Sequence, residues 1–186
     1  MVSSLDSYYK ISPDGAFIWR KKAEVPAYSG LLNLPSDKYL VINQSYSTTD
    51  TNNAVGGIFV MDDSCHNRDS MLLPDLFTSS FSNIDLTITN TIPKPDGGAV
   101  IVMTHGNIFS GNIAHISYLS AAIVYDIGPD GSLVNSRLWE QEGKSIYINA
   151  ATLSPDHHLV LSGMVQTPGT NYVYPFIYKT NLNEQQ

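Results

Sequence analysis

The side chains that could bind a metal ion in this chain are few and scattered. The sequence holds five histidines and one cysteine among 186 residues. A protein zinc site needs three or four converging His, Cys or carboxylate ligands. His157 and His158 are adjacent in a predicted turn, and His105 and His115 flank a segment that contains no carboxylate. We therefore expect neither a metal site nor a bound cofactor.

Groups that could support catalysis are equally sparse. Sialidase-like hydrolysis would need an arginine triad, whereas Arg20, Arg68 and Arg137 are predicted on strands or in a turn. Cys65 lies close to Asp and His residues in a turn, but no third group is placed to orient it as a nucleophile. The Gly-x-Ser-x-Gly elbow, the Walker loop and the dinucleotide fingerprint do not occur. We predict that the chain itself is not an enzyme.

Polar, uncharged side chains concentrate in three long segments, at 44–57, 105–117 and 166–172. Loops of this length in a compact fold are often functional, although plain solvated loops are the alternative. Such side chains would serve a glycan, peptide or protein ligand. The candidate binding residues are Asp50, Asn52, Asn53, His105, Asn107, Asn112, His115, Asn171 and Tyr172.

Charge and composition exclude other partners. Lys and Arg number 10 against 17 Asp and Glu, which gives a net charge of −7. Nucleic acids and anionic membranes require clustered cations, and the only such cluster is at 20–22. No apolar run is long enough to span a membrane. A surface rich in Ser, Thr and Asn favours an extracellular, periplasmic or cell-surface location, with the signal segment absent from this chain.

An internal repeat predicts the elements that position these residues. The segments LPSDKYLVI, PKPDGGAVI and LSPDHHLVL align on Asp37, Asp96 and Asp156, which are 59 and 60 residues apart. Each has a turn rich in Pro and Asp followed by an apolar run, which is typical of a tight hairpin. A second hairpin, YYKISPDGAFIW at 8–19, returns as VYDIGPDGSLVNSRLW at 124–139. Two alternating hairpins make a four-stranded unit.

The apolar runs indicate how these units pack. Those at 39–42, 99–103, 121–125 and 158–161 are nearly continuous, which indicates strands that are buried on both faces. Stacked four-stranded antiparallel meanders at this period are typical of β-propeller blades, and an irregular β-sandwich is the alternative. The tight turns would lie at one end of each meander and the long polar segments at the other.

We therefore predict an all-β chain of 13 strands, forming about three blades of an incomplete β-propeller. A single propeller segment, 1–186, would comprise a partial blade at 1–27, blades at 28–85 and 86–145, and a partial blade at 146–186. An incomplete propeller leaves sheet faces uncovered. We expect self-association, or the remainder of a longer propeller, to cover them.

The second hairpin carries a family resemblance. In both copies, Tyr9 to Trp19 and Tyr125 to Trp139, it resembles the Asp-Gly…Trp hairpin of propeller repeats in secreted or lipid-anchored bacterial surface proteins. The two tryptophans are predicted at equivalent strand positions, packed between blades. The resemblance implies a non-catalytic recognition or scaffold module. The alternative is a propeller domain of a larger enzyme, for example a glycan-active hydrolase, whose catalytic residues lie outside this chain.

Overall fold

The structure is a computed structural model that describes residues 2–4, 7–22, 30–34, 38–43, 54–62, 67–74, 86–105, 121–141, 143–167, 170 and 172–182. These residues form 14 strands and no helix, so the predicted all-β class is confirmed. The predicted number of 13 strands is wrong by one, because Val2–Ser4 adds a short strand, β1, beside β2. No helix in this part of the chain is long and apolar enough to cross a membrane.

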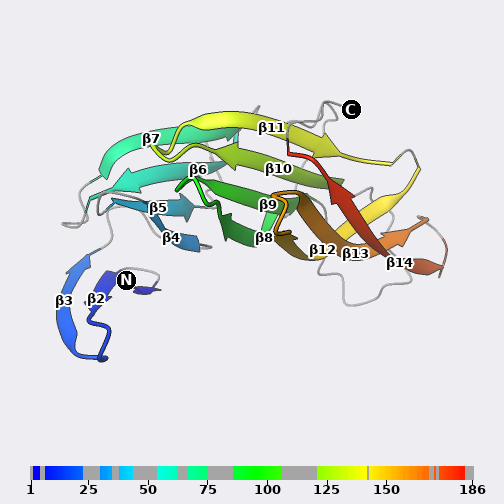
Figure 1. Cartoon of the computed structure of the whole chain (residues 1–186). Coiled ribbons are helices and arrows are strands. Elements are labelled where there is room, and N and C mark those ends of the chain that lie inside the picture. The colour runs from blue at the N-terminus through cyan, green and yellow to red at the C-terminus, as the bar shows by residue number, and fades with distance from the viewer. Residues whose placement is uncertain are drawn as a thin grey trace. The chain divides into compact units, whose positions relative to one another are not determined.

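The strands form four antiparallel sheets, each a meander in chain order (Figure 1). Sheet A contains β1, β2 (Ser7–Ile11) and β3 (Phe17–Lys22). Sheet B contains β4 (Gly30–Leu34), β5 (Lys38–Asn43), β6 (Ala54–Met61) and β7 (Asn67–Pro74). Sheet C contains β8 (Leu86–Pro93), β9 (Ala99–His105), β10 (Ala121–Ile127) and β11 (Leu133–Trp139). Sheet D contains β12 (Ser145–Leu153), β13 (Leu159–Gln166) and β14 (Val173–Thr180), and none of the four sheets closes on itself among the described strands.

The chain divides into two compact units. The first comprises Met1–Asp75 with Pro129–Ser132, and the second comprises Leu76–Gly128 with Leu133–Gln186. Sheets A and B belong to the first unit. There Tyr8 of sheet A packs with Val41 and Met61 of sheet B, and Trp19 and Phe59 lie against this cluster.

Sheets C and D of the second unit pack face to face. Successive side chains on a strand point to opposite faces, so Val100, Val102, Ala122 and Val124 share one face of sheet C. That face packs against Ile146, Ile148, Leu159 and Leu161 of sheet D. The first strands of the two sheets, β8 and β12, lie next to each other.

Burial differs between the central strands of the two sheets. All of 99–103 and 121–125 is buried, as the continuous apolar runs predict. In β13 the side chains instead alternate between buried and more exposed positions. The prediction of two buried faces is wrong for 158–161, because His158 and Val160, on the face turned away from sheet C, are only half-buried, and Met164 and Ile177 on that face are exposed.

Four hairpin turns share one construction, in which Pro and Asp precede a residue with positive φ. That residue is Gly15, Gly97, Gly131 or His157, with φ of 86°, 89°, 92° and 60°. The N–H of Gly97 donates to the Lys94 carbonyl at 3.0 Å, and the N–H of His157 donates to the Ser154 carbonyl at 2.8 Å. These are type I turns closed by a left-handed residue.

The aspartates of these turns complete them. Asp96 Oδ1 accepts a hydrogen bond from the Gly98 N–H at 2.8 Å, and Asp130 Oδ1 accepts one from the Ser132 N–H at 3.0 Å. The predicted tight turns at Asp14, Asp96, Asp130 and Asp156 are confirmed. The turn predicted at Asp37 lies outside the described residues.

The strand register corrects one prediction about the tryptophans. Trp19 pairs with Lys10, whereas Trp139 pairs with Ala122. Counted from the shared turn, Trp19 corresponds to Asn135, so Trp139 lies four residues further along its strand. The predicted equivalence of the two positions is wrong, because register in a hairpin is fixed by its turn and bulge rather than by the next tryptophan in the sequence.

Candidate functional site

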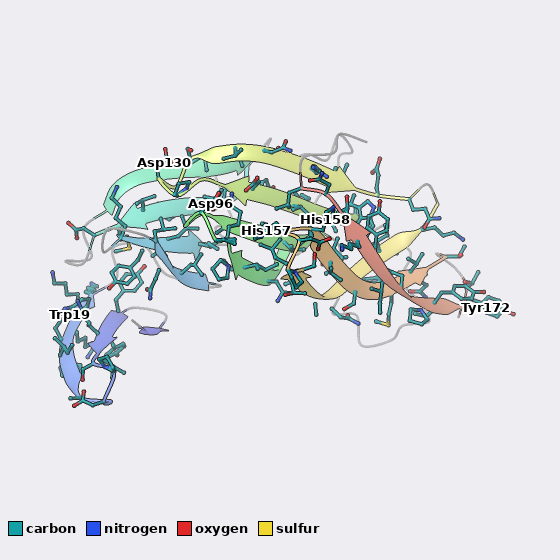
Figure 2. All side chains as sticks on the ribbon, in the orientation of Figure 1. Trp19, Asp96, Asp130, His157, His158 and Tyr172 are labelled. Carbon is teal, nitrogen blue, oxygen red and sulfur yellow. The ribbon has the colours of Figure 1, made fainter. Side chains whose placement is uncertain are left out.

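Most of the predicted ligand-binding residues lie outside the described residues: Asp50, Asn52, Asn53, Asn107, Asn112, His115 and Asn171. His105 is the last residue of β9 and pairs with Leu86 and Ala121. Tyr172 immediately precedes β14, and its side chain is 68% exposed. Figure 2 shows Tyr172 at the end of sheet D opposite to His157 and His158. Sheet D thus separates its tight turn from its longer connection, as predicted.

A cleft of about 330 Å³ lies between sheets C and D. Val124, Arg137 and Trp139 line its side on sheet C, and Leu159, Leu161 and Tyr178 line its side on sheet D. Sheet C has a fourth strand, β11, whereas sheet D ends at β14 among the described strands. No described strand therefore lies opposite to the outer part of β11, and this leaves the space that forms the cleft.

Arg137 is placed in this cleft by the alternation along β11. It pairs with Val124, which belongs to the face of sheet C that packs on sheet D. Its Nη1 donates a hydrogen bond to the Asn181 carbonyl at 2.8 Å. Its Nη2 is buried, and no described residue accepts a hydrogen bond from it. Leaving a buried donor unpaired costs about 1–3 kcal/mol, and more for a charged group.

The aromatic side of the cleft is held by ring contacts between the two sheets. The ring centroids of Trp139 and Tyr178 are 4.5 Å apart with an interplanar angle of 38°. Those of Trp139 and Phe176 are 5.6 Å apart at 90°. Trp139 therefore packs between sheets, as predicted for it, and also presents indole surface to the cleft.

Lys94 and Asp156, two charged groups at the turns, are in contrast already paired. Lys94 Nζ lies 2.7 Å from Asp126 Oδ1 and 3.2 Å from Asp96 Oδ2, and the Lys94 and Asp126 side chains are only 11% and 10% exposed. Burial alone would lower the pKa of Lys94, but hydrogen bonds to Asp126 and Asp96 outweigh it and raise that pKa above its ordinary value. This ion pair fastens the β8–β9 turn to β10, which is a structural role.

Asp156 forms a similar link in sheet D. Lys179 Nζ lies 2.6 Å from Asp156 Oδ2, and Ser154 Oγ donates to Asp156 Oδ1 at 2.5 Å. The hydrogen bond from Lys179, followed by that from Ser154, holds the pKa of Asp156 well below its usual range. Across the described residues, no group of three or more His, Cys, Asp or Glu side chains is arranged to hold a metal ion.

The cleft combines hydrogen-bond donors with apolar walls, an arrangement that suits the binding of a small ligand. Asn135 and Thr180 add polar groups to its lining beside Arg137. The sequence analysis gave Arg137 no binding role, although the alternation of side chains along its strand predicts that it faces inward. Trp139 was expected to face inward, and a residue two positions earlier on a strand must share that face. The chain matches no protein-family model, and no curated protein matches its sequence.

Proposed function

We propose that this chain is a non-catalytic recognition or scaffold module, built of β-propeller-like blades, from an exported or surface-attached bacterial protein. The observation that carries this proposal is the unequal length of the connections. Five-residue turns join β8 to β9 and β12 to β13, whereas residues 106–120 separate β9 from β10. In an antiparallel meander these two kinds of connection lie at opposite ends. Long polar connections on rigid, buried strands are typical of ligand recognition.

Two features of the second unit support the blade-like arrangement. The ladders of β8 and β12 are each interrupted by a bulge, between Ile88 and Asn90 and between Ile148 and Ala150, at a spacing of 60 residues. The two sheets also stack face to face with these first strands adjacent. Propeller blades stack in this way, each a four-stranded meander with its first strand innermost.

The ligand would be a glycan, peptide or protein held by the long polar segments. The test is a glycan and protein array probed with the whole chain, followed by a double variant, Asn107→Ala with Asn112→Ala. We expect that variant to lose binding, and the matched control Asn149→Ala, at an exposed position of β12, to retain it. Loss of binding in the control alone, or turnover of a sugar or peptide substrate by the chain itself, would contradict the proposal.

We also propose that the chain self-associates or joins the remainder of a longer propeller. In sheet A, Ile11 is 42% exposed, and Phe17, which pairs with it, is 64% exposed. Ile127, which occupies the position of Ile11 in the corresponding hairpin of sheet C, is fully buried. Apolar residues that are buried in one hairpin and exposed in its counterpart indicate a face that another sheet covers.

Light scattering across a dilution series tests the self-association. We expect the apparent mass to fall on dilution, and the double variant Ile11→Ser with Phe17→Ser to be monomeric at higher concentration than the parent. A parent chain that stays monomeric up to millimolar concentration would exclude a second copy as the covering partner.

A further inference from the structure

We infer that the cleft between β11 and β14 binds a carboxylate group that is carried on an apolar body. The inference rests on the proposal that the chain is a recognition module. It concerns a separate site, however, because the cleft is lined from β10, β11, β13, β14 and Leu182 rather than from the long polar segments. The two sites can therefore succeed or fail independently in experiments.

The anion-binding part of the site is the guanidinium of Arg137. The hydrogen bond from Nη1 to the Asn181 carbonyl fixes the orientation of the planar group. Nη2 is left buried without an acceptor among the described residues, and the described lining of the cleft includes no Asp or Glu. A carboxylate supplies a charged acceptor in the plane of the guanidinium, the geometry that arginine recognises best.

The rest of the cleft selects what carries the carboxylate. Trp139, Leu159, Leu161 and Leu182 provide apolar surface, and a volume of about 330 Å³ is at the lower end of the range for small-molecule sites. A bare anion would leave this surface in water, and a sugar would bury hydroxyl groups against leucine. An aryl or branched alkyl group attached to the carboxylate would cover the apolar lining and fit within this volume.

Two sources present this chemistry. One is a free carboxylic acid with an aromatic or branched alkyl group. The other is an Asp or Glu side chain of an extended peptide lying beside β14, which is the last strand of sheet D among the described strands. Pro175 has no N–H, so such a peptide would pair with the later half of β14, where Tyr178 and Thr180 line the cleft.

The test uses 3-phenylpropionate as the probe and the two indole N–H resonances of the full chain as the reporter, because Trp19 and Trp139 are its only tryptophans. Trp19→Phe assigns the two resonances. We expect saturable movement of the Trp139 resonance with a Kd of roughly 1–10 mM, which is ordinary for a ligand of this size. The neutral 3-phenylpropionamide should bind at least tenfold more weakly. Equal binding of acid and amide would overturn the inference, as would the absence of binding by the acid at 50 mM.

Variants separate the role of Arg137 from a change in folding. Arg137→Gln should reduce acid binding at least tenfold, and Lys22→Gln, which removes an exposed cation from β3, should leave it unchanged. If Arg137→Gln fails to fold, Leu182→Trp fills the cleft near the chain end and should abolish binding while Arg137 is kept. Retained binding in either folded cleft variant would overturn the inference.

A second pair of probes identifies the source of the carboxylate. Acetyl-Thr-Val-Glu-Val-Thr amide and its Gln counterpart test the peptide, and inorganic phosphate tests a bare anion. Tighter binding of the Glu peptide than of 3-phenylpropionate assigns the site to a strand-borne side chain, and the reverse order assigns it to a free acid. Phosphate that binds as tightly as 3-phenylpropionate would overturn the requirement for an apolar body. Array binding through the long segments would be unaffected by any of these results.

Discussion

Replacing Gly163 with alanine tests how closely β12 and β13 approach each other at the bulge of β12. A Cβ at position 163 would lie 1.9 Å from the Tyr147 carbonyl oxygen, 2.9 Å from its carbonyl carbon and 3.1 Å from Ile148 Cα. These are backbone atoms at the irregularity between Ile148 and Ala150, so no side-chain rotation can relieve the clash. Lengthening the 1.9 Å contact to an attainable distance of about 3 Å would require the two strands to separate by about 1 Å.

Overpacking of this kind costs about 1–3 kcal/mol, and each ladder hydrogen bond that is weakened adds about 1 kcal/mol. We therefore expect Gly163→Ala to lower the free energy of unfolding by about 4 kcal/mol. In a chain of this length that corresponds to a fall in Tm of roughly 10 °C.

The assay is urea denaturation of the Trp19→Phe protein, followed by the fluorescence of Trp139, which packs between sheets C and D. The control is Gly143→Ala, where φ is 67° and nothing lies within 4 Å of the added carbon. In that variant only the left-handed backbone is unfavourable for alanine, which should lower the free energy of unfolding by about 1 kcal/mol. A Gly163→Ala protein as stable as the Gly143→Ala protein would refute the proposed backbone clash.

Three further predictions concern the hairpin turns. Lys94→Met leaves the Asp126 carboxylate buried without its partner and should lower the free energy of unfolding, measured by urea denaturation, by about 3 kcal/mol. The control Lys22→Met, on the exposed edge of β3, should stay within about 0.5 kcal/mol of the parent. Similar losses of stability in both variants would contradict the role of the ion pair. His157→Gly removes the left-handed strain of a non-glycine residue at φ 60° and should raise the free energy of unfolding by about 1 kcal/mol, and a decrease would show that the imidazole stabilises the turn. The pKa of Asp156 is lowered by Lys179 and then by Ser154 from an ordinary 3.8, so its contribution to stability is present above about pH 4 and is lost as the pH falls toward the folded pKa. Carboxyl NMR should show that Lys179→Met raises the pKa of Asp156, and an unchanged titration would exclude Lys179 as the main cause.

The sequence was sufficient to predict the local hairpins because their determinants are local. Pro, Asp and a residue that tolerates positive φ occur in the same order at each turn, and the apolar runs that follow form strands. The additional strand β1 has no such signal, since Val2–Ser4 is too short to show alternation and, of the described strands, pairs with β2 alone. Its existence depends on a neighbouring edge, which periodicity does not reveal.

The candidate site was harder to predict because it depends on packing between sheets. The polar segments were recognisable by composition, but the cleft exists because no described strand of sheet D lies opposite to the outer part of β11. Whether an inward arginine is paired depends on residues 44 positions away, such as Asn181. Alternation places Arg137 on the packing face, and only the arrangement of the two sheets shows that no described residue accepts a hydrogen bond from Nη2.

The bulges of β8 and β12 connect the hairpin pattern of the sequence to the packing of the two sheets. A bulge adds one residue to a strand and disrupts the regular ladder around it. Asn90 follows the bulge in β8, and its Oδ1 accepts a hydrogen bond from the Ala151 N–H beside the bulge of β12 at 2.8 Å. Irregularities at matching positions thus supply a donor and an acceptor to each other, and this fixes how the two sheets align. The same alignment brings Trp139 against Tyr178 and sets Arg137 in the cleft beside them, so the geometry of the binding site follows from the register of the two sheets.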